Sequence, residues 1–183
     1  PAYAAADILA QAEHGSGHER CWLVSTSAKV IASVEKEIIK QLSERSRQKY
    51  IRKALKKNGW LIQVKSLVEA VDLANRLAPE HCELMIKNPG LIAKEIVSAG
   101  ALFLGNNSPT VAGDYVAGPS HTLPTGGAGA SFSGLTVDMF QRRTSVVEYT
   151  PAALKKSIAA IEQFASLEGL DAHGRSASIR LGS

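Results

Sequence analysis

The sequence has 183 residues, the size of one ordinary domain or of a domain with an appendage, which excludes a miniprotein that depends on disulfides. Hydrophobic residues make up 45% and charged residues 21%, so the composition is neither that of a disordered chain nor that of a coiled coil. A net charge of +4 is too small to argue by itself for a nucleic-acid or membrane partner.

Helical and strand patterns alternate from the start of the chain. Apolar residues recur at helical spacing over 3–14, and residues 21–24 form a short apolar run typical of a buried strand. The next predicted elements are helices at 31–42 and 45–57, a strand at 60–64, a helix at 67–77, a strand at 84–86, a helix at 91–97 and a strand at 101–104. Repeated strand–helix units predict an α/β fold with a mostly parallel sheet flanked by helices, an incomplete Rossmann-like arrangement.

The pattern changes after Gly105. Residues 106–133 are rich in Gly, Pro, Ser, Thr and Asn and have too few periodic apolar residues for a helix, so a long loop region is predicted. Residues 145–149 are typical of a strand, and a helix follows from Pro151 to about Gly169. We therefore expect an α/β domain over 1–133 and a small helical and strand appendage over 134–183.

The first candidate for metal binding is the pair Gln11 and His14. These residues are three apart on the first predicted helix, so both side chains emerge on one face, the spacing at which a helix offers two ligands to one metal. On spacing alone, a solvated or capping histidine is the commoner role for such a residue.

A second candidate is the dipeptide Glu80–His81, which follows Pro79 at the start of a strand or in a loop, where catalytic groups often lie. The plainer alternative is an ion pair at a strand edge. Cys82 is poorly placed to share a proton with His81, because adjacent side chains in a strand point to opposite faces.

Three further acidic and histidine side chains lie later in the chain. Asp114, in the polar loop region, could be an oxygen ligand beside imidazole nitrogens, or it could cap a turn. Glu168 and His173 flank Gly169 just past the last helix, where a solvent-exposed pair at the helix end is the simpler interpretation.

Seven basic residues between Arg45 and Lys57 could contact phosphates. They are interleaved with Tyr50, Ile51 and Leu55 at helical spacing, which favours a solvated face of a packed helix over a nucleic-acid-binding surface.

No segment predicts export or membrane insertion. No apolar run approaches the ~20 residues of a membrane helix, and the first residues lack the basic and apolar segments of a signal peptide. Two cysteines are too few for a disulfide scaffold, so a cytoplasmic protein is expected.

Five runs of the sequence, in this order, resemble the C-terminal part of histidinol dehydrogenase, the enzyme of the last two steps of histidine biosynthesis. They are ILAQAEHG, NRLAPEHCEL, AGALFLGNNSPTVAGDYVAGPSHTLPTGG, SGLTVDMFQRRTSVVEYT and LEGLDAHGRS. The resemblance extends over nearly the whole chain. It implies an oxidoreductase that requires zinc and NAD and converts L-histidinol through L-histidinal to L-histidine.

The resemblance also implies roles for individual residues. Glu80 and His81 match the catalytic pair of the family, and His121 and Glu168 match positions that contact the substrate, as do His81 and Asp114. The implied zinc ligands are Gln11, His14, Asp114 and His173.

Members of the family are longer chains that form homodimers in which the C-terminal tail is exchanged, so Glu168 and His173 would serve the partner's site. The part expected before Pro1 contains the NAD-binding segments, and no residue of this chain is therefore assigned to NAD. The alternative is a non-redox module that binds a metal or an imidazole compound with the same residues.

Overall fold

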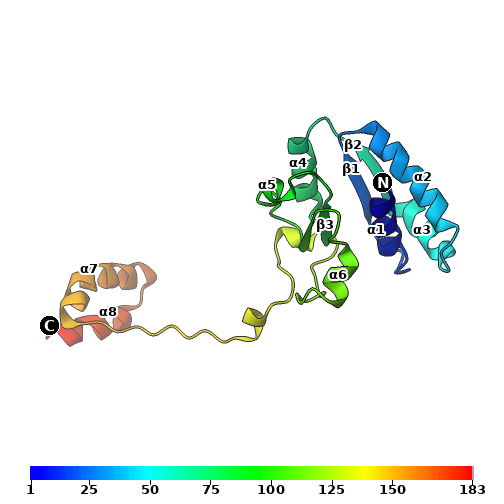
Figure 1. Ribbon diagram of the computed structural model, residues 1–183. Coiled ribbons are helices and arrows are strands. Elements are labelled where there is room, and N and C mark those ends of the chain that lie inside the picture. The colour runs from blue at the N-terminus through cyan, green and yellow to red at the C-terminus, as the bar shows by residue number, and fades with distance from the viewer. Residues whose placement is uncertain (183) are drawn as a thin grey trace. The chain divides into compact units, whose positions relative to one another are not determined.

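The computed structural model describes residues 1–182, which divide into two compact units (Figure 1). The first unit comprises Pro1–Phe140 and the second begins at Gln141. The sequence placed the boundary between residues 133 and 134. Each unit is described by itself below.

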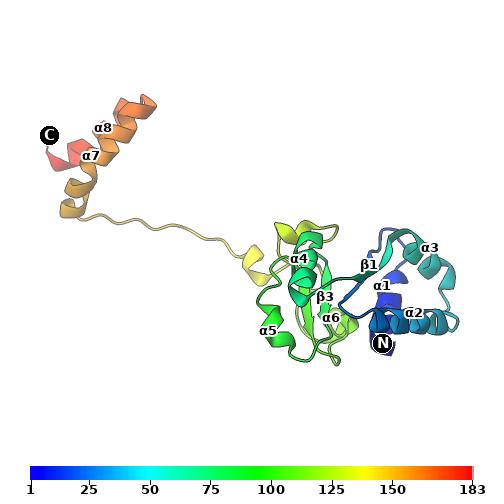
Figure 2. The same ribbon diagram turned by 90° about the horizontal axis from the view of Figure 1, so that it is seen from above.

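The first half of the first unit contains three helices around a pair of parallel strands (Figures 1 and 2). Strand β1 (Cys21–Ser25) pairs in parallel with β2 (Gly59–Gln63), and the helices α1, α2 and α3 all contact β1. The bounds of the helices are Ala2–Ala12 for α1, Ala28–Leu42 for α2 and Gln48–Asn58 for α3. These elements bury a core cluster of Leu9, Ala12, Cys21, Leu42, Ile51 and Ala54. Each of the three helices therefore buries its apolar face in this core.

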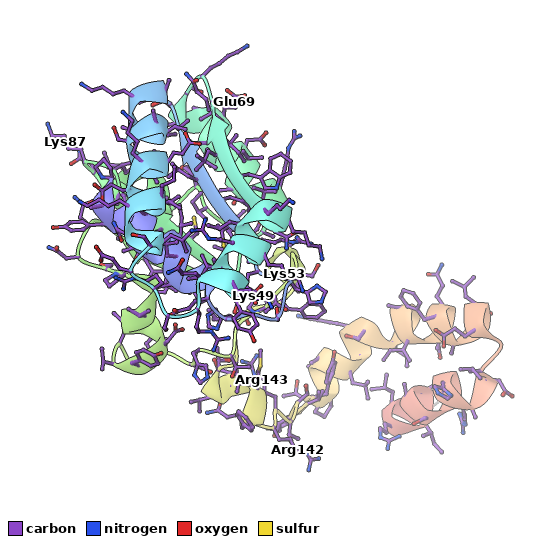
Figure 3. All side chains as sticks on the ribbon, turned by 90° about the vertical axis from the view of Figure 1, so that its right-hand side faces the viewer. Lys49, Lys53, Glu69, Lys87, Arg142 and Arg143 are labelled. Carbon is purple, nitrogen blue, oxygen red and sulfur yellow. The ribbon has the colours of Figure 1, made fainter. Side chains whose placement is uncertain are left out.

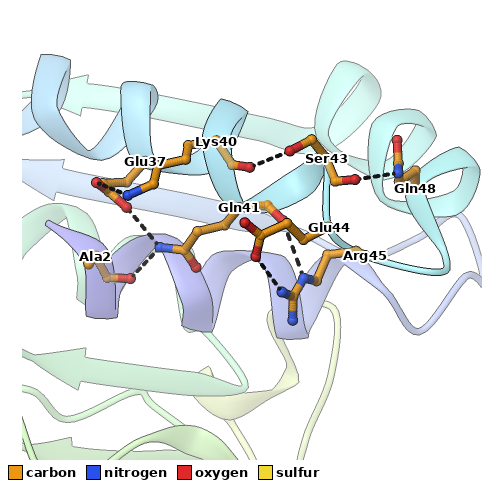
Figure 4. A network of polar contacts seen from close by, with 8 residues as sticks. All are labelled: Ala2, Glu37, Lys40, Gln41, Ser43, Glu44, Arg45 and Gln48. Carbon is orange, nitrogen blue, oxygen red and sulfur yellow. Dashed lines mark hydrogen bonds and ion pairs between the residues drawn. The ribbon is translucent and has the colours of Figure 1, made fainter.

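Polar contacts fix the start of α1 against the C-terminal half of α2 (Figure 4). The Gln41 side-chain amide donates to the Ala2 carbonyl oxygen at 3.0 Å and to the Glu37 carboxylate at 3.1 Å. At the other end of α2, the Ser27 hydroxyl accepts from the Val30 N–H and caps the helix. Hydrogen bonds and core packing together set the position of α1.

The second half of the first unit has the same strand–helix character. Strand β3 (His81–Leu84) pairs in parallel with β4 (Ala101–Leu104). The first residues of the two strands lie opposite each other, His81 with Ala101, and so do the last, Leu84 with Leu104. Three helices accompany this pair: α4 (Leu67–Leu77), α5 (Pro89–Ala93) and α6 (Thr110–Tyr115). Short 3₁₀ turns follow at Ala128–Ala130 and Val137–Phe140.

The α/β class with parallel strands and flanking helices is confirmed. Among the described residues, the four strands form two separate parallel pairs, where the sequence suggested one sheet. The prediction of a loop without a helix over 106–133 was wrong, because α6 forms there. Its six residues make too few turns for an apolar periodicity to show in the sequence.

The second unit is a pair of helices. Helix α7 (Pro151–Glu168) is capped by the Thr150 hydroxyl, ends at Gly169 in the left-handed conformation (φ 70°), and packs against α8 (Asp171–Ser178). A 3₁₀ turn, Ile179–Leu181, follows α8. The strand predicted at 145–149, and with it the strand part of the appendage, was wrong: within 141–182 no residue is in a strand. Val146 is 91% exposed. The segment has strand-forming side chains, but within 141–182 there is no strand with which its backbone could pair.

The basic helix has the solvated face that the sequence favoured. Lys49 and Lys53, one turn apart on α3, are exposed, whereas Ile51 and Ala54 are buried in the core cluster (Figure 3). No helix among residues 1–182 is both long and apolar enough to cross a membrane.

The turn into β4 leaves no room for a side chain at Gly100, where the chain passes close to the backbone before β3. A Cβ atom there would lie 2.7 Å from the Glu80 carbonyl oxygen, which is backbone and cannot rotate away. We expect Gly100→Ala to lower the free energy of unfolding by about 2 kcal/mol, measured by urea denaturation. Gly90→Ala is the matched control, because a Cβ there meets nothing within 4 Å and should not destabilise the chain. Equal stability of the two variants would contradict this account of the turn.

Candidate functional site

A cavity of about 1530 Å³ in the first unit brings together side chains from distant parts of the sequence. It is bounded by α1, β1, α4, β3, α6 and the loop that follows α6. Six residues singled out from the sequence line it: Gln11, His14, Glu80, His81, Asp114 and His121.

Helix α1 presents Gln11 and His14 to this cavity. Gln11 is half-buried in the last turn of α1, and His14 is exposed in the turn that follows the helix. The neighbouring residues Leu9 and Ala12 face the opposite way into the core, which leaves the polar face of α1 for the cavity. The Arg47 guanidinium donates to the His14 carbonyl oxygen at 3.2 Å and lies over the Tyr50 ring, so α3 holds the end of α1.

Glu19 fixes the loop that continues from His14. Glu19 is only 6% exposed, and its carboxylate accepts hydrogen bonds from the Ser16 and Gly17 N–H groups, the latter at 2.8 Å. Burial by itself would raise the pKa of Glu19, but these hydrogen bonds outweigh it and lower the pKa from 4.5 to about 2. The loop therefore folds around an ionised carboxylate.

Glu80 and His81 lie where α4 turns into β3, as the sequence predicted for the start of a strand. Ala78, the residue after α4, is in the left-handed conformation (φ 44°), which reverses the chain ahead of Pro79. The Glu80 carbonyl oxygen then accepts from the Ala101 N–H at 2.8 Å. Pairing with β4 thus begins at the dipeptide itself and fixes its backbone.

The His81 imidazole is enclosed but has no hydrogen-bond partner. Its side chain is 14% exposed, and neither Nδ1 nor Nε2 makes a hydrogen bond within residues 1–182. The Asp114 carboxylate lies 3.8 Å from His81 Nε2, and the Phe103 ring packs against the imidazole with 5.9 Å between centroids. Buried polar atoms are nearly always paired, so two unpaired nitrogens in a cavity mark a place for a polar ligand.

The two cysteines are free thiols, and neither is suited to nucleophilic catalysis. Burial and, to a smaller extent, the negative charge of Glu83 together raise the pKa of Cys82 to about 11. Burial, with the charge of Glu19, raises the pKa of Cys21 to about 12. Both thiols therefore stay protonated at neutral pH, in agreement with the sequence argument against a cysteine nucleophile.

Helix α6 carries Asp114 to the cavity. A Cβ atom at the preceding residue, Gly113, would lie 2.7 Å from the Phe103 ring, so α6 approaches β4 closely at this point. The Asp114 side chain is 26% exposed, and the exposed His121 follows in the loop beyond.

Glu168 and His173 belong to the second unit, where both are exposed and line a separate pocket of about 460 Å³. The described residues contain no group of three or more His, Cys, Asp or Glu side chains placed to hold a metal ion. In the first unit the expected ligands of these types are only His14 and Asp114, since Gln11 contributes an amide.

The sequence analysis did not single out Asp7, Glu83 and Thr110, which also line the cavity. The signal was present for Asp7, which lies one helical turn before Gln11 and therefore on the same face. Glu83 lies two residues after His81 in a strand, and such residues also share a face.

The chain was compared with known proteins. The sequence profile of histidinol dehydrogenase matches residues 1–181. The chain belongs to the histidinol dehydrogenase family. The histidinol dehydrogenases of Geobacter metallireducens and Heliobacterium mobile are 45% and 43% identical to it over 181 residues, which is 99% of this chain.

A solved structure of the family agrees with the fold. The crystal structure of histidinol dehydrogenase from Elizabethkingia anophelis matches with a TM-score of 0.94 and 34% identity, covering 100% of this chain and 42% of that one. The chain likewise spans 41% of the Geobacter metallireducens protein and 42% of the Heliobacterium mobile protein. It thus corresponds to about two fifths of the length of these histidinol dehydrogenases.

The ionised Glu19 makes stability depend on pH. The folded chain holds the pKa at about 2 against 4.5 for an unperturbed carboxyl, so its contribution is complete above pH 4.5 and is lost as the pH falls toward 2. We expect Glu19→Gln to lower the free energy of unfolding at pH 7 by about 2 kcal/mol and to flatten its pH dependence between these limits. Urea denaturation at several pH values measures both, with the exposed Glu13→Gln as control. Parallel pH curves for Glu19→Gln and the unsubstituted chain would contradict the assignment.

Proposed function

We propose that this chain forms the metal- and substrate-binding part of a zinc-dependent, NAD-linked histidinol dehydrogenase. In the proposed reaction, L-histidinol loses four electrons in two steps, through L-histidinal to L-histidine. The observation that carries the proposal is the His81 imidazole, enclosed beside the Asp114 carboxylate with both ring nitrogens unpaired within residues 1–182. The family match supports the substrate class.

The side chains of the cavity fit a zinc ion by their chemistry. An amide oxygen, an imidazole nitrogen and a carboxylate oxygen are ligand types that zinc accepts, and Gln11, His14 and Asp114 supply one of each to the same cavity. We propose these three as ligands, with His173 of a second copy of the chain as the fourth. A bound zinc ion would supply a Lewis acid that holds the imidazole and amine of the substrate.

His81 is the proposed general base. An imidazole takes and gives protons readily near neutral pH, and an unpaired ring nitrogen in the cavity is free to accept the proton of the substrate hydroxyl. The hydroxyl-bearing carbon loses a hydride to NAD in the same step, which gives the aldehyde. Asp114, 3.8 Å from His81 Nε2, stabilises the imidazolium that forms.

Glu80 is the proposed base for the second step. It takes a proton from water, whose oxygen adds to the aldehyde carbon and forms the hydrate. A second hydride leaves that carbon for a second NAD while His81 accepts the hydroxyl proton, and the carboxylic acid results. Each turnover therefore consumes one water and reduces two NAD.

The remaining assignments concern binding and assembly. His121 lines the cavity, and we propose that it contacts the substrate together with Glu168 of a second copy. The proposed assembly is a homodimer with shared sites. Both cysteines are free, in keeping with the cytoplasmic location that we propose. No residue of this chain is assigned to NAD.

The function is tested by NADH formation from L-histidinol in the presence of zinc. The assay uses this chain with the portion of the Geobacter metallireducens relative that it does not cover, supplied as a separate chain. NADH formation that requires both chains supports the proposal. Zinc binding by this chain with no NADH formed in any mixture would overturn it in favour of a non-redox metal-binding module.

The two proposed bases predict different kinetic defects in the same reconstituted enzyme. His81→Asn should reduce the rate of both oxidations by roughly 10²–10⁴-fold, because both need a proton acceptor at the oxidised carbon. Glu80→Gln should reduce the oxidation of added L-histidinal far more than the formation of L-histidinal from L-histidinol. Single-turnover measurements with each substrate separate the steps, with the exposed Glu95→Gln as control. Equal losses in both steps for Glu80→Gln would contradict the assignment.

A further inference from the structure

Three polar side chains connect the three elements that carry the proposed site in the first unit. The Glu83 carboxylate on β3 accepts from the N–H of Thr110 at 2.9 Å and from its hydroxyl at 2.5 Å, where α6 begins. The Asp7 carboxyl on α1 is hydrogen-bonded to the same Glu83 side chain. Glu83 is therefore shared between α1 and α6.

Two carboxyl groups can form a hydrogen bond only when one of them holds a proton. Burial, the charge of Glu83 and the hydrogen bond to it, in decreasing order, together raise the pKa of Asp7 from 3.8 to about 7. Thr110 directs two donors at the Glu83 carboxylate, an arrangement that favours its charged form, so we assign the shared proton to Asp7.

Asp7, Thr110 and Glu83 each share a face of their helix or strand with a residue of the proposed site. Asp7 lies one turn before Gln11 on α1, and Thr110 lies one turn before Asp114 on α6. Glu83 lies two residues after His81 on β3, so both side chains leave the same face of the strand. The three hydrogen-bonded residues therefore neighbour two proposed zinc ligands and the proposed base along the same faces, without being part of the site themselves.

We propose that Asp7, Glu83 and Thr110 act as positioning residues that hold α1, β3 and α6 at the spacing at which Gln11, His14 and Asp114 bind one zinc ion. The effect on zinc rests on the proposed function, whereas the shared proton does not. None of the three residues is a proposed ligand, and their effect is exerted through the placement of the elements.

Infrared spectroscopy of this chain at pH 6 tests the shared proton. A protonated carboxyl band is expected in the unsubstituted chain, and Asp7→Asn should remove it. Glu83→Gln should also remove it, because Asp7 then ionises and accepts from the new amide. The exposed Glu35→Gln, on α2, is the control and should leave the band unchanged. A band that persists in Asp7→Asn, or that is absent from the unsubstituted chain, would overturn the inference.

Zinc affinity, measured by titration calorimetry with zinc chloride, tests the positioning role. Asp7→Ala should weaken binding roughly tenfold. Asp7→Asn should stay within about threefold of the unsubstituted chain, because the amide still donates to Glu83. The cap variant Ser66→Ala, which removes the hydroxyl that accepts from the Glu69 N–H at the start of α4, should lower the free energy of unfolding but leave the zinc affinity of the folded chain unchanged. Equal affinities for Asp7→Ala and Asp7→Asn would overturn the positioning role.

The two measurements separate this inference from the proposed function. If the unsubstituted chain bound no zinc, the proposed function and the positioning role would fail together, and the infrared band would still decide whether the shared proton exists.

Discussion

The packing of α1 is the constraint on which the candidate site depends. Leu9 and Ala12 lie on one face of this helix and are buried in the core that it shares with β1, α2 and α3. The opposite face, which carries Asp7 and Gln11, is thereby directed to the cavity. A rotation of α1 that moved these polar groups away would expose Leu9, at a cost of about 2 kcal/mol for one leucine side chain. The hydrophobic core thus determines where the polar face points.

A second constraint acts at β3. The parallel pairing of β3 with β4 begins at His81, and the left-handed turn at Ala78 precedes it, so the backbone of the Glu80–His81 dipeptide is fixed on both sides. Its side chains can then face a cavity without being held by other side chains. This explains how the His81 imidazole is enclosed while its nitrogens find no partner in the described part of the chain. Rigid backbone and unpaired polar atoms are the combination expected of a preorganised binding site.

Sequence reasoning succeeded where a signal was local. The periodicity of the first helix and the apolar run at 101–104 predicted α1 and β4. Pro79 indicated a strand entrance or a loop at Glu80–His81, and β3 does begin at His81, three residues before the strand predicted at 84–86. It failed where the outcome depends on tertiary partners. Residues 145–149 have strand-forming side chains but no edge to pair with, and the six residues of α6 are too few for a periodic pattern. The link from Asp7 to Glu83 joins residues far apart in the sequence, and spacing alone does not predict it.

The proposed ligand set spans both units, since Gln11, His14 and Asp114 lie in the first and His173 lies in the second. X-ray absorption at the zinc edge of the zinc-loaded chain tests the central claim most directly, because it reports the donor atoms. We expect a first shell of nitrogen and oxygen only, at ~2.0–2.2 Å, because the four proposed ligands supply amide, carboxylate and imidazole donors and no sulfur. A sulfur neighbour at ~2.3 Å would show that zinc is held by Cys82 or Cys21 and would contradict the account.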